Sequence, residues 1–127
     1  MAECRVPISI RPEPGRIVWA EFLDTGGNQT YAHPAVILTG KAEIDAGGLI
    51  VVAVVSTKLH LSKAEDQIPL PWMARPGGHP VTKLNKKCAV VCSWIRPIQE
   101  KDILAYAGVV PDRTFEVILA GVSELMQ

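Results

Sequence analysis

The chain has 127 residues, a length that suits one domain with a hydrophobic core and leaves little room for two. Hydrophobic residues make up 48% of it and charged residues 20%, a balance that excludes an intrinsically disordered chain. The formal net charge is +0, so no overall electrostatic field attracts nucleic acid.

Membrane and secreted classes are also disfavoured. The longest apolar run, residues 49–55, is far shorter than the roughly 20 residues that span a bilayer. The first residues, MAECRVPISI, lack the sustained apolar core of a secretory signal. The cysteine count of 3, without a disulfide-rich pattern, is typical of a reducing compartment, so we expect a cytoplasmic protein.

The first strand is expected directly after a short arm. Prolines punctuate the beginning of the chain, which predicts an extended N-terminal arm over 1–12 and a single domain over 13–127. Residues 16–22, RIVWAEF, are rich in β-forming residues whose alternate positions face opposite ways, the pattern of a strand. A polar, glycine-bearing loop at 24–28 ends it.

Two more strands are expected before residue 60. Pro34 biases His33 toward an extended backbone and can open a strand but hardly lie in its middle, so the second strand is predicted over 33–39. A glycine pair at 47–48 marks the next turn. Residues 49–57 form a continuous apolar run, which predicts a strand covered on both faces.

The middle of the chain is predicted to hold a long loop between two strands. Residues 67–70 indicate a short edge strand. Residues 71–80, PWMARPGGHP, are too rich in proline and glycine for regular structure, and loops of this length are often functional. A further strand is predicted over 88–96, closed by Pro97.

On this strand Cys88, Cys92 and Trp94 are expected to share one face. The two cysteines would be about 13 Å apart along a strand, too far for a mutual disulfide or a shared metal, so we interpret them as core residues. His60 and His79 lack a partner at ligand spacing, and no metal or cofactor is assigned.

The chain is expected to end in helices. A short helix is predicted over 99–105, and a longer one begins at Asp112, a suitable N-cap. Apolar residues then recur at helical spacing, at Phe115, Ile118, Leu119, Val122, Leu125 and Met126. About five short strands with one late helix, and no strand–helix alternation, favour a mainly β (α+β) fold, a small β-barrel.

Four motifs follow one another in a recognisable order. They are GRIVWAEF from residue 15, HPAVIL from residue 33, VVST from residue 54 and WIRPI from residue 94. Together they resemble the MazF/PemK-type growth-inhibitor toxins of bacterial type II toxin-antitoxin systems, over residues 14–125. The resemblance implies an SH3-like barrel with a C-terminal helix, a homodimer, cleavage of single-stranded RNA, and neutralisation by a small antitoxin protein.

The resemblance also implies where the site lies and how it departs from the family. His33 stands where the family has an arginine before proline, Asn28 where it has an acidic residue, and Trp94 where it has a glutamine. Metal-free RNA cleavage needs proton transfer and stabilisation of a charged phosphate. An imidazole can move a proton near neutral pH, which an arginine hardly does.

We therefore take His33, Ser56 and Thr57 as catalytic candidates. The hydroxyls at 56 and 57 can donate to a phosphate oxygen, although a hydroxyl at a strand end more often bonds nearby backbone. His33 equally remains open to interpretation as a histidine at the start of a strand with no chemical role.

Substrate binding is predicted from a basic stretch. Residues 67–99 contain no acidic residue, and bases can stack on tryptophan. The alternative is a solvated face for the lysines and core packing for one tryptophan. The substrate-binding candidates are Asn28, Gln29, Trp72, Lys86, Trp94 and Arg96.

Three functions are compatible with these observations. The first is a metal-independent endoribonuclease toxin. The second is a catalytically degenerate relative that binds RNA or a protein partner, favoured by the substituted positions. The third resembles the gyrase-poisoning toxin CcdB, but residues 123–127 lack the tryptophan that its action would use.

Overall fold

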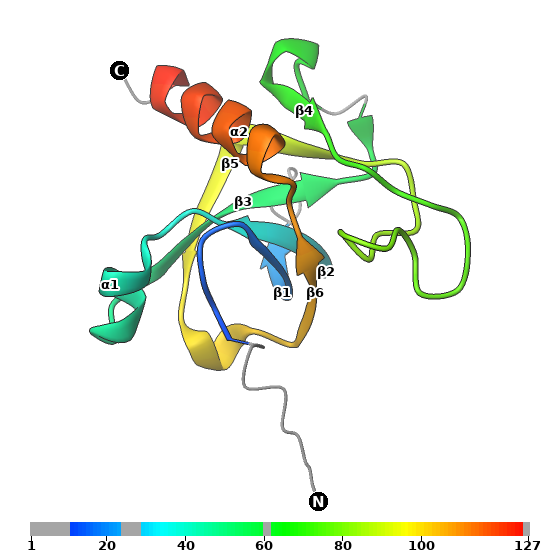
Figure 1. Cartoon of the computed structure of the whole chain (residues 1–127). Helices are drawn as coiled ribbons and strands as arrows, with labels where there is room; N and C mark the ends of the chain where they lie inside the picture. The colour runs from blue at the N-terminus through cyan, green and yellow to red at the C-terminus, as the bar shows by residue number, and fades with distance from the viewer. Residues whose placement is uncertain (1–10, 24–28, 60–61, 126–127) are drawn as a thin grey trace, which may run out of the picture.

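The computed structural model describes residues 11–23, 29–59 and 62–125 (Figure 1). A curled antiparallel sheet of 6 strands, with the order β4-β5-β3-β2-β1-β6, forms a half-barrel. The strands are β1 Arg16–Leu23, β2 Thr30–Ile37, β3 Ile50–Ser56, β4 Gln67–Pro69, β5 Ala89–Ile98 and β6 Ala105–Val109. The helices are α1 Lys41–Asp45 and α2 Asp112–Leu125, with 3-10 turns η2 Ala64–Asp66 and η3 Glu100–Asp102. The predicted fold class, mainly β with a C-terminal helix, is confirmed.

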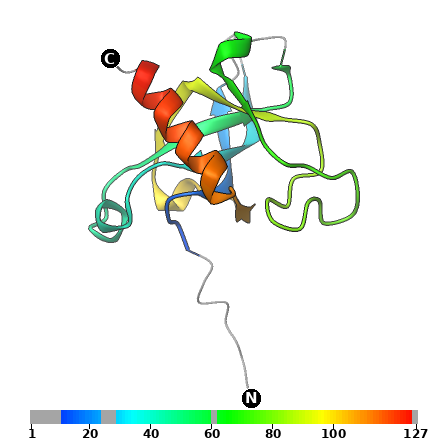
Figure 2. The same ribbon diagram turned by 45° about the horizontal axis from the view of Figure 1, so that its top comes forward.

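Apolar side chains fill both faces of the sheet. Helix α2 lies across one face of the sheet (Figure 2). One core cluster lies beneath this helix and includes Ile118 and Val122. The other lies on the opposite side of β3 and contains Phe22 and Trp94. Alternate residues of β3 enter the two clusters, and the strand is buried from residue 52 to residue 56. The predicted strand covered on both faces is thus confirmed.

The second strand begins earlier than predicted, at Thr30 instead of residue 33, and Pro34 lies in its middle. Pairing explains why a proline is tolerated there. β2 pairs with β1 from Leu23↔Thr30 onward, but with β3 only over residues 35–37. The half of β2 before residue 35 therefore has an open edge, the place in a sheet where proline is accepted.

A bulge in β5 overturns the predicted face of Trp94. Ala53 pairs with Ile95 and Val55 with Val90, so residues 91–94 of β5 stand opposite one residue of β3. A bulge breaks the alternation of side chains. Cys88 and Cys92 lie in the core cluster under α2, as expected for core residues, whereas Trp94 lies in the other cluster.

The same strand also continues past Pro97 to Ile98. β4 pairs only with the beginning of β5, at residues 89–91, so the edge beside Pro97 does not need an N–H donor. The prediction that Pro97 closes the strand was wrong for this reason.

The helix predicted over 99–105 is absent: residues 100–102 form the short turn η3, and Ala105 already begins the next strand, β6, which was not predicted. Its sequence, AYAGV, has few β-branched residues, so its pattern is weak. β6 pairs with β1 and completes the half-barrel.

The final helix has Asp112 as its first helical residue, so it begins one residue earlier than the predicted N-cap role of Asp112 requires. Ile118 and Val122 are buried, whereas Leu119 and Leu125 are exposed, so only part of the predicted apolar stripe enters the core. Within the described residues, no helix is long and apolar enough to cross a bilayer.

Candidate functional site

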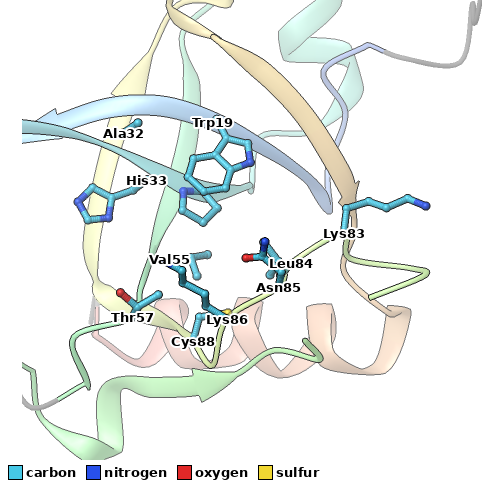
Figure 3. Close-up of a pocket in the computed structure, with 11 residues that line it drawn as sticks. Trp19, Ala32, His33, Val55, Thr57, Lys83, Leu84, Asn85, Lys86 and Cys88 are labelled. Carbon is cyan, nitrogen blue, oxygen red and sulfur yellow. The ribbon is translucent and has the colours of Figure 1, made fainter. Parts of the chain in front are cut away.

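A cavity of about 430 Å³ opens between β1, the open edge of β2, the end of β3 and the loop over residues 70–88 (Figure 3). Its walls mix apolar surface with a few polar groups. The lining residues are Trp19, Ala32, His33, Pro34, Val55, Thr57, Lys83, Leu84, Asn85, Lys86 and Cys88. No carboxylate is among these, so the lysine charges meet no acidic wall within the described part of the chain.

His33 is half-buried and stands on the boundary between this cavity and the second core cluster. It pairs with Ala20, and side-chain alternation places it on the face of β2 that enters this cluster with Ala35. Because β3 pairs with β2 only from Ala35 onward, the edge beside His33 is open. The imidazole thus borders the cavity at that open edge while its inner side packs on the core.

Two aromatic rings contact the imidazole. The ring centroids of His33 and Trp94 are 5.1 Å apart with planes at 69°, an edge-to-face arrangement. Phe22 lies 6.4 Å from His33 and 6.5 Å from Trp94, measured between centroids. The three rings form one cluster behind the cavity wall.

Trp94 is therefore a core residue at this site. Only 7% of its surface is exposed, which leaves no ring face for an RNA base. Of the two interpretations of this residue, stacking on substrate and packing in the core, the structure supports the second. The reason is the bulge in β5, which turns the indole inward.

The two hydroxyls at the end of β3 have different surroundings. Thr57 lines the cavity and is exposed, and in the view of Figure 3 it projects near His33 at one end of the cavity. Ser56 is buried, and its Oγ accepts a hydrogen bond from the backbone N–H of Lys58 at 3.0 Å. Ser56 thus bonds nearby backbone, while Thr57 is available to a ligand.

The long loop supplies the basic wall. Lys83, Asn85 and Lys86 are exposed and line the cavity. The loop lacks helix and strand, as predicted, but it is held by its own hydrogen bonds. The Oγ1 of Thr82, a fully buried residue, donates to the Pro71 carbonyl at 2.8 Å and accepts from the Leu84 N–H at 3.2 Å.

Other predicted substrate-binding residues lie outside the cavity. Arg96 is exposed, donates from Nη1 to the Ile95 carbonyl at 2.9 Å, and lines a separate hollow of about 570 Å³ with Glu21. Trp72 is 42% exposed but does not line the cavity. Gln29 is exposed and accepts a hydrogen bond from the Tyr31 hydroxyl. Asn28 lies outside the described residues.

Sequence reasoning missed Trp19 and Asn85 as lining residues, and it counted Lys83 only as a member of the basic stretch. Trp19 pairs with Pro34, the residue after His33, across β1 and β2. Pairing of the two predicted strands was therefore the signal that could have placed Trp19 beside the site. Lys83 and Asn85 lie in an irregular loop, and no periodic pattern in the sequence points to them. Lys83 adopts φ 65, a left-handed turn that no local propensity indicates for lysine.

The cavity contains one thiol, that of Cys88. Burial raises the pKa of this thiol to about 11. A thiol with this pKa is almost entirely neutral near pH 7, and the thiolate is the reactive form. The groups of the cavity that suit proton transfer and phosphate binding near neutral pH are therefore the imidazole, the Thr57 hydroxyl and the two lysines.

Comparison with known proteins gives a consistent match. A family model described as the PemK-like, MazF-like toxin of type II toxin-antitoxin systems matches residues 13–126. Among curated proteins, none matches this sequence. Several solved structures share the fold.

MazF from Deinococcus radiodurans is similar with a TM-score of 0.69 and 18% identity, over 91% of this chain and 96% of that one. The Mycobacterium tuberculosis toxin MazF-mt6 has a TM-score of 0.66 and 17% identity, over 87% of this chain and 95% of that one. An endoribonuclease in complex with its cognate antitoxin, from a mycobacterial species, has a TM-score of 0.64 and 17% identity, over 91% of this chain and 95% of that one.

Proposed function

The chain belongs to the PemK/MazF family of toxins of type II toxin-antitoxin systems, and we propose that it is a metal-independent endoribonuclease acting on single-stranded RNA. Toxins of this kind are endoribonucleases. The observation that supports the proposal is the shared cavity of His33, Thr57 and Lys86, which joins a proton-transfer group, a hydroxyl donor and a cation.

The proposed mechanism assigns a role to each group. His33 removes the proton from a ribose 2′-hydroxyl, whose oxygen then attacks the adjacent phosphorus. The phosphorus–5′-oxygen bond breaks, the leaving 5′-oxygen takes up a proton from water, and a cyclic phosphate remains. The imidazolium of His33 then returns its proton to solvent. Thr57 donates to a non-bridging oxygen, and Lys86 stabilises the negative charge that builds on the phosphate.

The remaining candidates are placed on flanking nucleotides. Lys83 and Asn85 extend the basic wall of the cavity beyond the reacting phosphate. Asn28, Gln29, Trp72 and Arg96 stay proposals for contacts to neighbouring nucleotides. An exposed tryptophan and an arginine suit an unpaired base and a phosphate, respectively.

We further propose a cytoplasmic homodimer that a small antitoxin protein neutralises, with residues 13–127 acting as one domain. Support comes from solved relatives: MazE-MazF complexes of Deinococcus radiodurans share this fold, with 21% identity and a TM-score of 0.63 in one form.

One observation favours a second candidate function. Trp94 stands at the position where the family has a glutamine, and its indole is in the core. The candidate site therefore lacks a polar side chain at this position. A protein that keeps the cavity and lysines but does not react would act as a binding module for RNA or for a protein partner.

Cleavage of a mixed single-stranded RNA pool in excess EDTA tests the proposal. Wild type should cut the RNA, and His33→Ala should lose at least about 100-fold in rate, the usual contribution of proton transfer. Circular dichroism confirms that the variant is folded. Cleavage that needs added metal, or persists in His33→Ala, contradicts the mechanism, and RNA binding without cleavage supports the binding module.

A further inference from the structure

Trp94 owes its position to an irregularity of β5. Regular alternation would place it on the face of Cys92, under α2, but the bulge over residues 91–94 turns it to the other face, beside His33. Bulges are common next to active sites, where they re-aim a side chain. Here the re-aimed side chain contacts the imidazole at the edge of the cavity.

The indole is also an unusual choice for filling a core. Its Nε1–H is buried and meets no hydrogen-bond acceptor among the described residues. A buried donor without an acceptor is unfavourable, and a wholly apolar side chain at this position would not carry one. A compensating benefit must come from the ring itself, and its described aromatic contacts are with His33 and Phe22.

The strand that carries the imidazole is paired with β1 but not with β3 at this position. One edge of the strand is therefore open there. A group that transfers a proton must be held within hydrogen-bond reach of its target. Packing against rings that are themselves locked in a core is a way to hold it.

We propose that Trp94, backed by Phe22, is a positioning residue that holds the imidazole of His33 in a single orientation at the cavity. Both rings are nearly fully buried, and both contact His33. The edge-to-face contact between Trp94 and His33 is favourable and directional, so it favours one imidazole rotamer. The proposal rests on the proposed ribonuclease function, in which His33 transfers the proton.

Two variants of Trp94 and one control test it. Trp94→Leu keeps an apolar side chain but removes the ring, and Trp94→Phe keeps a ring. Ile98→Ala is the matched control, because Ile98 lies in the same strand and the same core cluster and is also 7% exposed. NMR three-bond couplings of His33 report its χ1 rotamer without any RNA.

We expect one His33 rotamer in wild type, Trp94→Phe and Ile98→Ala, and averaged couplings in Trp94→Leu. With RNA, Trp94→Leu should lower kcat about tenfold or more with KM changed less than about twofold, since misplacement affects the chemical step. Trp94→Phe should recover most of the loss.

A single rotamer in folded Trp94→Leu overturns the proposal, as does an equal loss of kcat in Ile98→Ala. If Trp94→Leu fails to fold, Phe22→Leu gives the same comparison by removing the other ring. A wild-type protein that leaves RNA intact contradicts only the proposed function, because the rotamer measurement needs no cleavage.

Discussion

The carbonyl oxygen of Val81 occupies the space where a side chain of Gly108 would begin. A Cβ built on Gly108 would be 1.8 Å from that oxygen, and the Gly108 N–H donates to the Thr82 carbonyl at 3.0 Å. The long loop is therefore packed backbone to backbone on β6. This contact anchors the segment that brings Lys83, Asn85 and Lys86 to the cavity.

We predict that Gly108→Ala loosens the loop. The methyl group cannot fit without moving the backbone, so the free energy of unfolding should fall by about 1–3 kcal/mol. KM for RNA should rise, because the basic wall moves. Urea unfolding and steady-state cleavage check both effects.

Gly40→Ala is the matched control for this substitution. A Cβ at Gly40 would meet the mobile end of the Glu43 side chain, and the backbone has φ -67, which any residue adopts. Stability and KM should hardly change. Equal effects of the two substitutions would mean that the contact with the Val81 carbonyl is not what anchors the loop.

Ser56 and Thr57 are predicted to respond in opposite ways to loss of their hydroxyls. Ser56→Ala removes the acceptor of the Lys58 N–H, so it should cost about 1 kcal/mol of stability and leave kcat nearly unchanged. Thr57→Val keeps the shape of an exposed residue and should leave stability unchanged while lowering kcat about tenfold or more. Thermal unfolding and single-turnover cleavage separate the two effects. A loss of kcat in Ser56→Ala, with none in Thr57→Val, would mean that Ser56 and not Thr57 has the catalytic role.

Lys86 is predicted to bind a phosphate through charge. Lys86→Ala should weaken binding of a non-cleavable 2′-deoxy oligonucleotide for all sequences alike. The slope of log K against log salt concentration should become shallower by about 0.7, the value for one phosphate of a single strand. Lys63→Ala is the control, because Lys63 lies outside the lining of the cavity. An unchanged slope in Lys86→Ala would remove this lysine from the RNA path.

Several strands could be predicted because their sequences have a strong local pattern. The apolar run of β3 and the alternation in β1 are examples, and both strands were placed within about two residues. The start of β2 and the end of β5 could not be predicted, because each depends on where the neighbouring strand ends, and only there is a proline tolerated. β6 was missed because its pairing with β1, not its own residues, makes it a strand.

The candidate site shows the same division. His33 and Thr57 were found because each lies next to a strand end or proline that a local pattern indicates, and Lys86 because of the basic stretch. The inward turn of Trp94 depends on a register shift between β3 and β5, which only the paired strands reveal. Asn85 reaches the cavity through the hydrogen bonds of its loop, and no spacing in the sequence encodes these.

Cys88 gives a prediction for stability at high pH. Burial raises the pKa of its thiol from 9.0 to about 11. The folded state therefore holds this proton more tightly than the unfolded state, so the associated stability is complete below about pH 9 and is lost as the pH rises toward 11. The free energy of unfolding of wild type should fall over this range by on the order of 1 to 2 kcal/mol more than that of Cys88→Ala.

Groups common to both proteins also contribute to the pH dependence, so the difference between the two proteins is the quantity to measure. Urea unfolding at pH 7, 9 and 10.5 supplies it. Parallel pH curves for wild type and Cys88→Ala would show that the buried thiol contributes nothing to this loss.

The substitution His33→Arg separates the two roles that a cation at this position can have. An arginine binds phosphate at least as well as histidine, but it hardly gives up a proton near neutral pH. If His33 transfers a proton, His33→Arg should keep the affinity for a non-cleavable oligonucleotide within about threefold and lose about 100-fold or more in kcat.

In addition, the rate of wild type should change with pH across the range where imidazole ionises, whereas the residual rate of His33→Arg should not. Cleavage assays between pH 5 and 9, alongside binding measured at the same salt concentration, give both quantities. Full activity in His33→Arg would show that the position supplies positive charge alone, and the proton would then have to be moved by another group of the cavity.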